Sequence, residues 1–295
     1  MTTDNDIKQQ VREFYDQVGW QEVGEGVYQN ARYEDLRPVS RDYIHRCHLR
    51  VKRHLASKGR YFLDAGSGPI QYPEYLTYSE GYEFRVCADI SIQALMEARK
   101  RIGNHGLYVV ADVANLPFAP EVFEGAVSLH TIHHLPIREH LQAYRELYRV
   151  MKPASVAVIV NGWFNPPLGE ILDGFGKWVL RVRGFVNHRL LKRDVNVAEI
   201  NPVGAQQKKG ERKSTFVDKN HPSWFKAEIA SRFPMEIRVW RSVSVKQMRI
   251  FIQEKWGGRF LLRLLYWLEE RFPHWFGVNG QYPLIILRKP GTFSR

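Results

Sequence analysis

The chain has 295 residues, of which 44% are hydrophobic and 25% are charged, as in globular domains and unlike disordered chains. Its 43 Lys and Arg exceed its 31 Asp and Glu by 12, which favours anionic substrates, nucleic acid or an acidic membrane surface without choosing among them. Two cysteines exclude a disulfide framework and a four-cysteine zinc site. No apolar run approaches the ~20 residues that span a bilayer, and residues 1–10 lack a signal peptide's apolar core. We therefore expect a cytoplasmic protein.

Residues 1–58 are predicted to form an N-terminal helical cap. Apolar side chains between Val11 and Val18 recur at helical spacing, and a second, basic helix is expected over residues 41–58.

From Arg60 onward, short apolar runs alternate with amphipathic segments, notably residues 92–101 and 138–151. Strands that alternate with helices indicate βαβ units, and so predict an α/β fold with a parallel sheet covered on both faces. The predicted strands are residues 61–63, 84–88, 107–111, 125–129, 155–160, 235–243 and 284–287.

The strands divide the chain further. Residues 59–163 are expected to form the core, and residues 235–295 to add the strands and helix that complete the sheet. Between them, residues 164–234 are expected to be an insertion, with an apolar helical stripe from Leu168 to Val182 and a polar loop over residues 204–214.

A glycine-rich turn follows the first predicted strand. Gly66 and Gly68 would let backbone N–H groups approach a ligand closely. A dinucleotide fingerprint would need a third glycine where Gln71 stands, and no Gly-Lys-Ser/Thr follows to make a phosphate loop. Asp64, two residues before the turn, suits a ligand with a positive group and would repel a pyrophosphate.

Two further acids end the next predicted strands. Asp89 is placed to accept both hydroxyls of a ribose, and Asp112 to accept an amino proton of an adenine. Acids at the carboxyl ends of three successive strands line one crevice. A ligand with a cationic amino-acid end, a ribose and an adenine satisfies all three, and S-adenosylmethionine is such a ligand.

In these features the sequence resembles the class I S-adenosylmethionine-dependent methyltransferases, especially the type called methyltransferase type 11. Six motifs match in order over residues 61–160. They are FLDAGSG (62–68), ADIS (88–91), ADVANLPF (111–118), FEGAVS (123–128), HHL (133–135) and ELYRVMKP (146–153). The family's third motif glycine is replaced by Ile70, Ala154-Ser155 replaces a Gly-Gly pair, and Glu124 stands where Asp is common.

The resemblance implies a Rossmann-like fold, with a mostly parallel seven-stranded sheet and helices on both faces. It also implies that the N-terminal helices and the helical insertion form a lid. The cofactor-binding residues that it indicates are Asp64, Gly66, Gly68, Asp89, Ile90, Asp112, Val113 and His130.

The resemblance points to His133 and His134 as catalytic residues. Methyl transfer to an oxygen usually needs a base, and histidine suits that task near neutral pH. The alternative, in which the pair caps the loop or packs beneath the substrate, carries equal weight. No carboxylate or cysteine accompanies His130 and this pair at ligand spacing, so no metal site is predicted. Tyr15 and Trp20 resemble aromatic lid positions, although we favour a core role for them.

Two segments bear on the acceptor. Arg181, Arg183, Arg189, Lys192 and Arg193 give the insertion a positive bias that suits an acidic acceptor, unless they form a solvated helix face. The predicted helix over residues 259–270 is apolar around most of its circumference, so it is buried or meets a partner or membrane. We favour burial against the sheet; a lipid-like acceptor is the functional alternative.

The leading hypothesis is a methyltransferase that uses S-adenosylmethionine and acts on a small organic acceptor, acidic or lipid-like. Oxygen is the favoured target, with carbon or nitrogen left open. Methylation of RNA and a catalytically silent scaffold are the alternatives, while an oxidoreductase is disfavoured by Asp64 and Gln71. Nucleic acid is a disfavoured partner, and peripheral membrane contact is left open. The acceptor and the oligomeric state cannot be read from the sequence.

Overall fold

The computed structural model describes residues 3–24, 27–28, 34–190 and 215–291; for residues 22–24, 27–28 and 182–190 it describes the backbone alone. The polar loop predicted over residues 204–214 lies outside the described residues, as do the basic residues Lys192 and Arg193.

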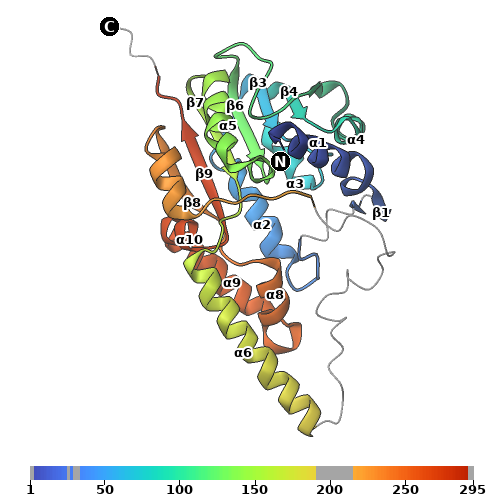
Figure 1. Cartoon of the computed structure of the whole chain (residues 1–295), viewed down its shortest axis with the longest axis vertical. Helices are drawn as coiled ribbons and strands as arrows, with labels where there is room; N and C mark the ends of the chain where they lie inside the picture. The colour runs from blue at the N-terminus through green and yellow to red at the C-terminus, as the bar shows by residue number, and fades with distance from the viewer. Residues whose placement is uncertain (1–2, 25–26, 29–33, 191–214, 292–295) are drawn as a thin grey trace.

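Within the described residues, seven strands form one sheet in the order β5-β4-β3-β6-β7-β9-β8 (Figure 1). β3 pairs in parallel with β4 and β6, whereas β9 is antiparallel to both β7 and β8. The predicted Rossmann-like, mostly parallel sheet is thus confirmed. The strands are β3 (Gly59–Ala65), β4 (Tyr82–Asp89), β5 (Gly106–Val110), β6 (Phe123–Leu129), β7 (Met151–Val160), β8 (Met235–Arg241) and β9 (Tyr282–Arg288). A separate pair is formed by β1 (Glu22–Gly24) and β2 (Val27–Tyr28).

Helices cover both faces of the sheet because its strands are apolar on both sides. Leu63 of β3 packs with Tyr144 of α5 on one face, and the adjacent Phe62 packs with Ile44 of α2 on the other. The helices are α1 (Asp4–Phe14), α2 (Arg41–Lys52), α3 (Pro73–Leu76), α4 (Ile92–Ile102), α5 (Ile137–Val150), α6 (Pro167–Leu190), α7 (Pro222–Phe225), α8 (Val245–Phe251), α9 (Gly258–Arg271) and α10 (Pro273–Asn279).

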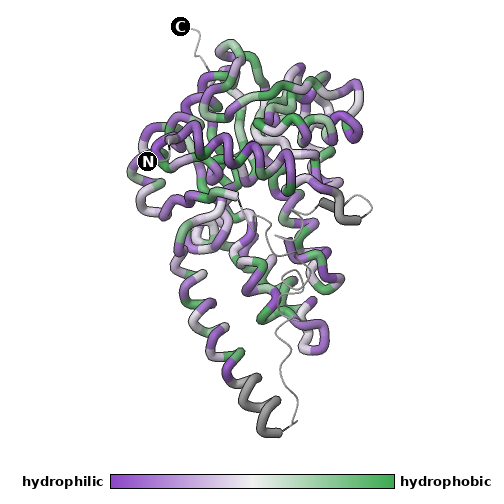
Figure 2. The backbone as a smooth tube through the Cα atoms, turned by 45° about the vertical axis from the view of Figure 1, so that its right-hand side comes forward, coloured by the Kyte–Doolittle hydropathy of each residue, from purple (hydrophilic) through white to green (hydrophobic). Residues whose placement is uncertain are grey.

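The helix predicted in the insertion is α6, which leaves the sheet as one long helix (Figure 1, Figure 2). Its apolar stripe is not buried throughout: Ile171, Phe175 and Trp178 are 69%, 51% and 56% exposed. None of the helices in the described part of the chain has both the length and the apolar composition needed to cross a membrane.

Burial of α9 against the sheet was expected, and the structure shows it for one side of the helix only. The helix packs inward through a narrow strip that includes Leu262 and Glu269, while Phe260 and Trp267 are 68% and 59% exposed. Glu269 decides this orientation, because its buried carboxylate accepts hydrogen bonds from Tyr43 and Arg50. A charged group with those partners holds the side of the helix that carries Leu262 and Glu269 inward, and it leaves Phe260, Trp267 and the charged Arg263 outward.

Candidate active site

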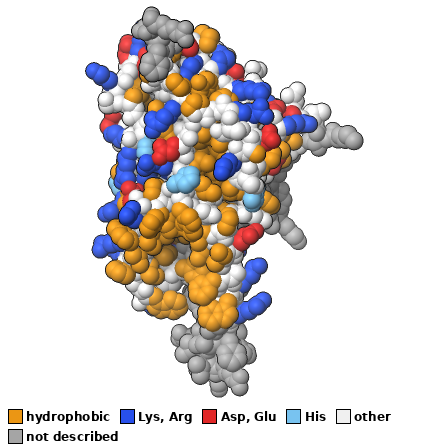
Figure 3. Space-filling view, turned by 90° about the vertical axis from the view of Figure 1, so that its left-hand side faces the viewer, with side chains coloured by type: hydrophobic (Ala, Val, Ile, Leu, Met, Phe, Trp, Pro, Cys, Tyr) orange, Lys and Arg blue, Asp and Glu red, His pale blue; other side chains and the backbone are white. Residues whose placement is uncertain are grey.

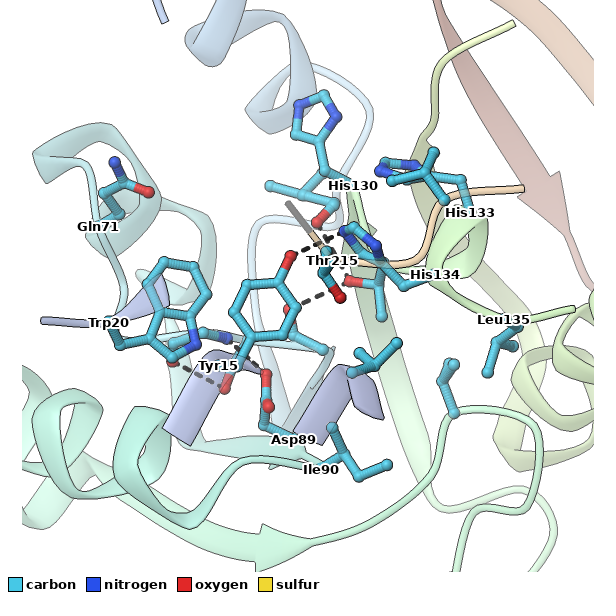
Figure 4. A pocket seen from close by; sticks show the side chains of 18 of the residues that line it. Tyr15, Trp20, Gln71, Asp89, Ile90, His130, His133, His134, Leu135 and Thr215 are labelled. Atoms are coloured by element: carbon cyan, nitrogen blue, oxygen red, sulfur yellow. Dashed lines mark hydrogen bonds between the residues drawn. The ribbon is translucent and has the colours of Figure 1, made fainter. Parts of the chain in front are cut away.

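A cavity of about 360 Å³ opens at the carboxyl ends of β3, β4 and β6, in the size range of small-molecule sites. The N-terminal helices, the glycine turn, the ends of β4 and β5, the loop after β6 and residues 215–219 of the insertion all contribute to its wall, as does Arg241 at the end of β8. Figure 4 shows Tyr15 between the Asp89 side of the cavity and His134.

The glycine turn adopts backbone angles that side chains rarely tolerate. Gly66 has φ +75°, and a Cβ there would lie 2.1 Å from the hydroxyl oxygen of Thr131. Gly68 has φ +56°, with the Trp20 ring above it. Ile70 also has positive φ, 56°, although it is β-branched and fully buried. The turn therefore keeps its left-handed geometry at the position of the missing third glycine, at a cost of about 1–2 kcal/mol.

Asp64 does not line the cavity, although direct cofactor contact was expected of it. Its carboxylate is buried and accepts hydrogen bonds from Arg85, with 3.1 Å between Arg85 Nε and Asp64 Oδ2. Arg85 stands on the neighbouring strand and also donates to the carbonyl of Tyr75. In this arrangement the acid ties β3 to β4 beneath the turn, since its charge is already balanced by a guanidinium.

Asp89 lines the cavity and holds the glycine turn. Its Oδ2 accepts the Gly68 N–H and its Oδ1 the Ser91 N–H, each at 2.8 Å. Burial raises the pKa of Asp89 to about 6, although these two N–H groups act in the opposite direction. Each oxygen keeps a further acceptor position for a ligand hydroxyl.

Asp112 also lines the cavity, but both of its carboxylate oxygens already accept hydrogen bonds. Its Oδ1 accepts the Ala114 N–H at 2.9 Å, and its Oδ2 lies 2.6 Å from Nζ of Lys8. Lys8 also pairs with Glu139 at 2.5 Å, so α1 is fastened over this end of the cavity by two carboxylates. A ligand amino group that reached Asp112 would share Oδ2 with Lys8 or displace it.

The two predicted catalytic histidines differ in their hydrogen bonding. His134 Nδ1 lies 2.7 Å from the carbonyl oxygen of Phe216, so Nδ1 must carry the proton. His134 Nε2 then accepts the hydroxyl proton of Tyr15 at 2.8 Å. Both ring nitrogens are therefore occupied, and burial lowers the pKa of His134 to about 4.

His133 has a buried Nδ1 with no hydrogen-bond partner among the described residues. Its ring centre is 4.4 Å from that of His134 and 6.2 Å from that of His130. Burial first, and then the positive charges that His134, His130 and Lys219 would bring, lower the pKa of His133 well below its usual value. Burial likewise lowers the pKa of His130 to about 3. The cluster is uncharged at neutral pH.

Two cations, Arg241 and Lys219, also line the cavity. Arg241 is buried, pairs with Glu34 and leaves its Nε without a partner among the described residues. Burial opposes ionisation of Glu34, yet Arg241 and His48 lower its pKa to about 2. Lys219 extends over Gly162, where a Cβ would lie 3.0 Å from the lysine Cε. No carboxylate is paired with Lys219 within the described residues, so it contributes an unbalanced positive charge.

The sequence located part of this wall. Lining residues that it identified are Gly66, Gly68, Asp89, Ile90, Asp112, Val113, His130, His133 and His134. Tyr15 and Trp20 also line the cavity, where a core role was favoured. The sequence did not identify four further lining residues, because no motif marks them: Lys8, Glu34, Lys219 and Arg241. Of the insertion, Thr215, Val217 and Lys219 line the cavity, whereas α6 with Arg181 does not, and the side chains of Arg183 and Arg189 lie outside the described residues. In the described part of the chain, no group of three or more His, Cys, Asp or Glu side chains has an arrangement that could hold a metal ion.

Comparison with known proteins identifies the core of the chain. Residues 63–159 match a family model described as a methyltransferase domain. The chain is 28% identical over 128 residues to methyltransferase GfsG of Streptomyces halstedii, across 40% of this chain and 45% of that protein. The match thus spans less than half the length of this relative.

Two solved structures share the fold along almost the whole chain. The [4+2]-cyclase SpnF has a TM-score of 0.53 and 16% identity, with 96% of this chain and 97% of that one covered. Geranyl diphosphate C-methyltransferase from Streptomyces coelicolor A3(2) has a TM-score of 0.51 and 15% identity, with 96% and 98% covered. At such identities the likeness shows a shared fold and nothing beyond it.

The residues of the cavity fit S-adenosylmethionine. Gly66 and Gly68 leave the backbone of the turn without side chains, and a Cβ at Gly66 would clash with Thr131. The carboxylate of Asp89 lines the cavity and can accept further hydrogen bonds. Ile90 and Val113 add apolar wall beside Asp112.

Replacing Ile70 tests the strained turn. Ile70→Ala and Ile70→Gly both lose a buried side chain, but only Ala keeps a Cβ at positive φ, so the Gly variant should be more stable by about 1 kcal/mol. Urea unfolding followed by circular dichroism measures the difference. The matched control is Leu95, which is buried in the same cluster but lies within α4; there Gly should be less stable than Ala. The same order at both positions would contradict the argument.

The raised pKa of Asp89 predicts a pH dependence of cofactor binding. Because that pKa is about 6, acidification from pH 7 to pH 5 protonates the carboxylate and removes an acceptor of ligand hydroxyls. Calorimetry with S-adenosylhomocysteine should show affinity falling about tenfold over this range. Asp89→Asn should bind about tenfold or more weakly at pH 7 and lose most of the pH dependence. A wild-type affinity that stays constant, with the fold intact by circular dichroism, would refute this role.

Proposed function

We propose that this chain is a methyltransferase that uses S-adenosylmethionine and methylates an oxygen of a small, acidic acceptor. The observation that carries the proposal is the make-up of one continuous cavity. Its wall includes the glycine turn and Asp89, and also Lys219 and Arg241 together with uncharged histidines.

The proposed cofactor site is built from hydrogen-bond acceptors and exposed backbone. When bound there, S-adenosylmethionine supplies a methyl group on a positively charged sulfur. Asp89 would accept the ribose hydroxyls, Asp112 an adenine amino proton, and Ile90 and Val113 would contact the base. Asp64 would act indirectly, by holding the turn through Arg85.

The proposed acceptor site is suited to an anion. Lys219 brings a positive charge that no carboxylate of the described structure pairs with, and the unpartnered Nε of Arg241 offers a donor in the same wall. A cation lowers the pKa of a nearby acidic hydroxyl because it stabilises the ionised form. An acceptor with a carboxyl, phenol or enol group would therefore bind and ionise here more readily than an alkyl alcohol.

His133 is the base in this proposal. Its Nδ1 is free among the described residues, whereas both nitrogens of His134 are bonded. A ring with a low pKa is unprotonated throughout the neutral range but is a weak base, so it matches an acidic proton better than that of an alkyl alcohol. His134 would be a positioning residue, which joins Tyr15 to Phe216 and so holds the N-terminal helices against the cavity.

Transfer itself must be measured, because a [4+2]-cyclase shares the fold. The protein is incubated with methyl-labelled S-adenosylmethionine and a cell extract, and the label is followed into an organic fraction and an RNA fraction. Label in small acidic molecules supports the proposal. Label in RNA would favour an RNA methyltransferase, and no transfer despite cofactor binding would favour a silent scaffold.

The histidines give a graded prediction. His133→Ala should lower the rate of label transfer at least about 100-fold while cofactor affinity is kept, since a base contributes roughly 10²–10⁴-fold. Tyr15→Phe should lower it only about fivefold, because it removes one neutral hydrogen bond. Full activity in His133→Ala would exclude this histidine as the base.

Lys219 is tested on the acceptor. Once a labelled acceptor is purified, Lys219→Met should raise its KM about tenfold or more, since a charge-assisted bond is lost, with little change in cofactor affinity. Lys219→Arg should restore part of the effect. The matched control, Lys226→Met, changes an exposed lysine outside the cavity wall and should leave KM unchanged. An unchanged KM in Lys219→Met would argue against an anionic acceptor held at this position.

A further inference from the structure

The outer surface of α9 and α10 carries a continuous run of large apolar side chains. On α9, Phe260, Leu264 and Trp267 follow helical spacing and form one stripe. Figure 3 shows hydrophobic side chains gathered over this part of the molecule, with Lys and Arg around them. The α9–α10 face comprises Phe260 (68% exposed), Leu261 (42%), Leu264 (43%), Trp267 (59%), Phe272 (50%) and Trp275 (52%).

The packing of α9 and α10 onto the rest of the fold does not require these side chains to be exposed. α9 is fixed to the sheet from its other side, where Leu262 is buried and Glu269 accepts the Ser242 N–H at 2.9 Å. Trp275 likewise projects from α10 while its neighbour Phe276 is buried. Exposed apolar patches of this kind usually mark an interaction surface.

The charges around the face are unbalanced toward positive. Glu254 pairs with Arg259 at 2.7 Å, and Glu270 pairs with Arg50 at 2.9 Å, so these acids are neutralised. Within the described residues, no carboxylate is paired with Lys255, Arg263 or Arg271. Arg271 instead lies over the ring of Phe272, with 5.4 Å between its Cζ and the ring centre.

We propose that the α9–α10 face docks on an anionic lipid bilayer. Aromatic and Leu side chains on one side of a helix, flanked by Arg and Lys, are the composition of helices that lie in the membrane interface. Trp and Phe insert at the headgroup boundary, and unbalanced cations add attraction to anionic lipids. The net charge of +12 acts in the same direction.

A second copy of the chain is a poorer occupant on electrostatic grounds. In a two-fold dimer the face would meet itself. The unbalanced cations beside one copy would then oppose those beside the other, and like charges repel across an interface. An anionic bilayer covers the same apolar area and balances the charge. The proposal does not depend on methyl transfer.

Vesicle sedimentation tests the proposal. The full chain is mixed with vesicles of phosphatidylcholine alone, or of phosphatidylcholine and phosphatidylglycerol in equal parts. Binding to the anionic vesicles at low salt, with much less binding at high salt, is expected. Phe260→Ser with Trp267→Ser should weaken it at least about tenfold, because two large apolar side chains no longer insert. Arg263→Glu with Arg271→Glu should weaken binding to the anionic vesicles.

The matched control is Ile92→Ser with Met96→Ser, which removes two equally exposed apolar side chains (52% and 55%) from α4; its binding should equal that of the wild type. Circular dichroism checks that each variant is folded. The proposal is overturned if the wild type does not sediment with anionic vesicles, or if neither double variant changes its binding. It is also overturned if the wild type is a dimer in solution that Phe260→Ser with Trp267→Ser dissociates while no vesicle binding occurs.

Discussion

One carboxylate holds the cavity in shape. Asp89 ends β4, and its two oxygens accept N–H groups from the glycine turn after β3 and from the start of α4. The turn is pressed from its other side by Thr131, which leaves no space for a side chain at Gly66. Three loops are therefore fixed relative to one another by short contacts. Burial raises the pKa of Asp89 to about 6, so this arrangement is sensitive to acid.

The charges of the site are organised by pairing. Arg85 balances Asp64 beneath the turn, and Arg241 and His48 lower the pKa of the buried Glu34. Because the negative charges of these acids are balanced by their partners, Lys219 supplies the positive charge that an incoming acceptor would meet. Lys219 thus places one of the chain's excess positive charges in the cavity wall. Many of the chain's other cations lie on the surface, including those beside α9.

The sequence predicted the parts of the structure that depend on local patterns. Apolar runs located the strands of the sheet, and the spacing of Gly66, Gly68 and Asp89 located the turn and the acid beside it. It could not show that Arg85 on the next strand would claim Asp64, because a cross-strand ion pair leaves no signal in either segment. Lys8 and Lys219 lie far apart in the sequence, and only the folded chain brings both of them to the cavity. For α9, the periodicity predicted an apolar helix. It could not predict which side faces inward, because that depends on the pairing of Glu269 with Arg50.

Binding of S-adenosylmethionine in this cavity is the basis of the proposed function, and calorimetric titration of the whole chain measures it directly. We expect saturable binding of one S-adenosylmethionine per chain and no binding of NAD, because Gln71 stands where a dinucleotide fingerprint needs its third glycine. Absence of saturable binding of S-adenosylmethionine, or an equal affinity for NAD, would contradict the proposed function.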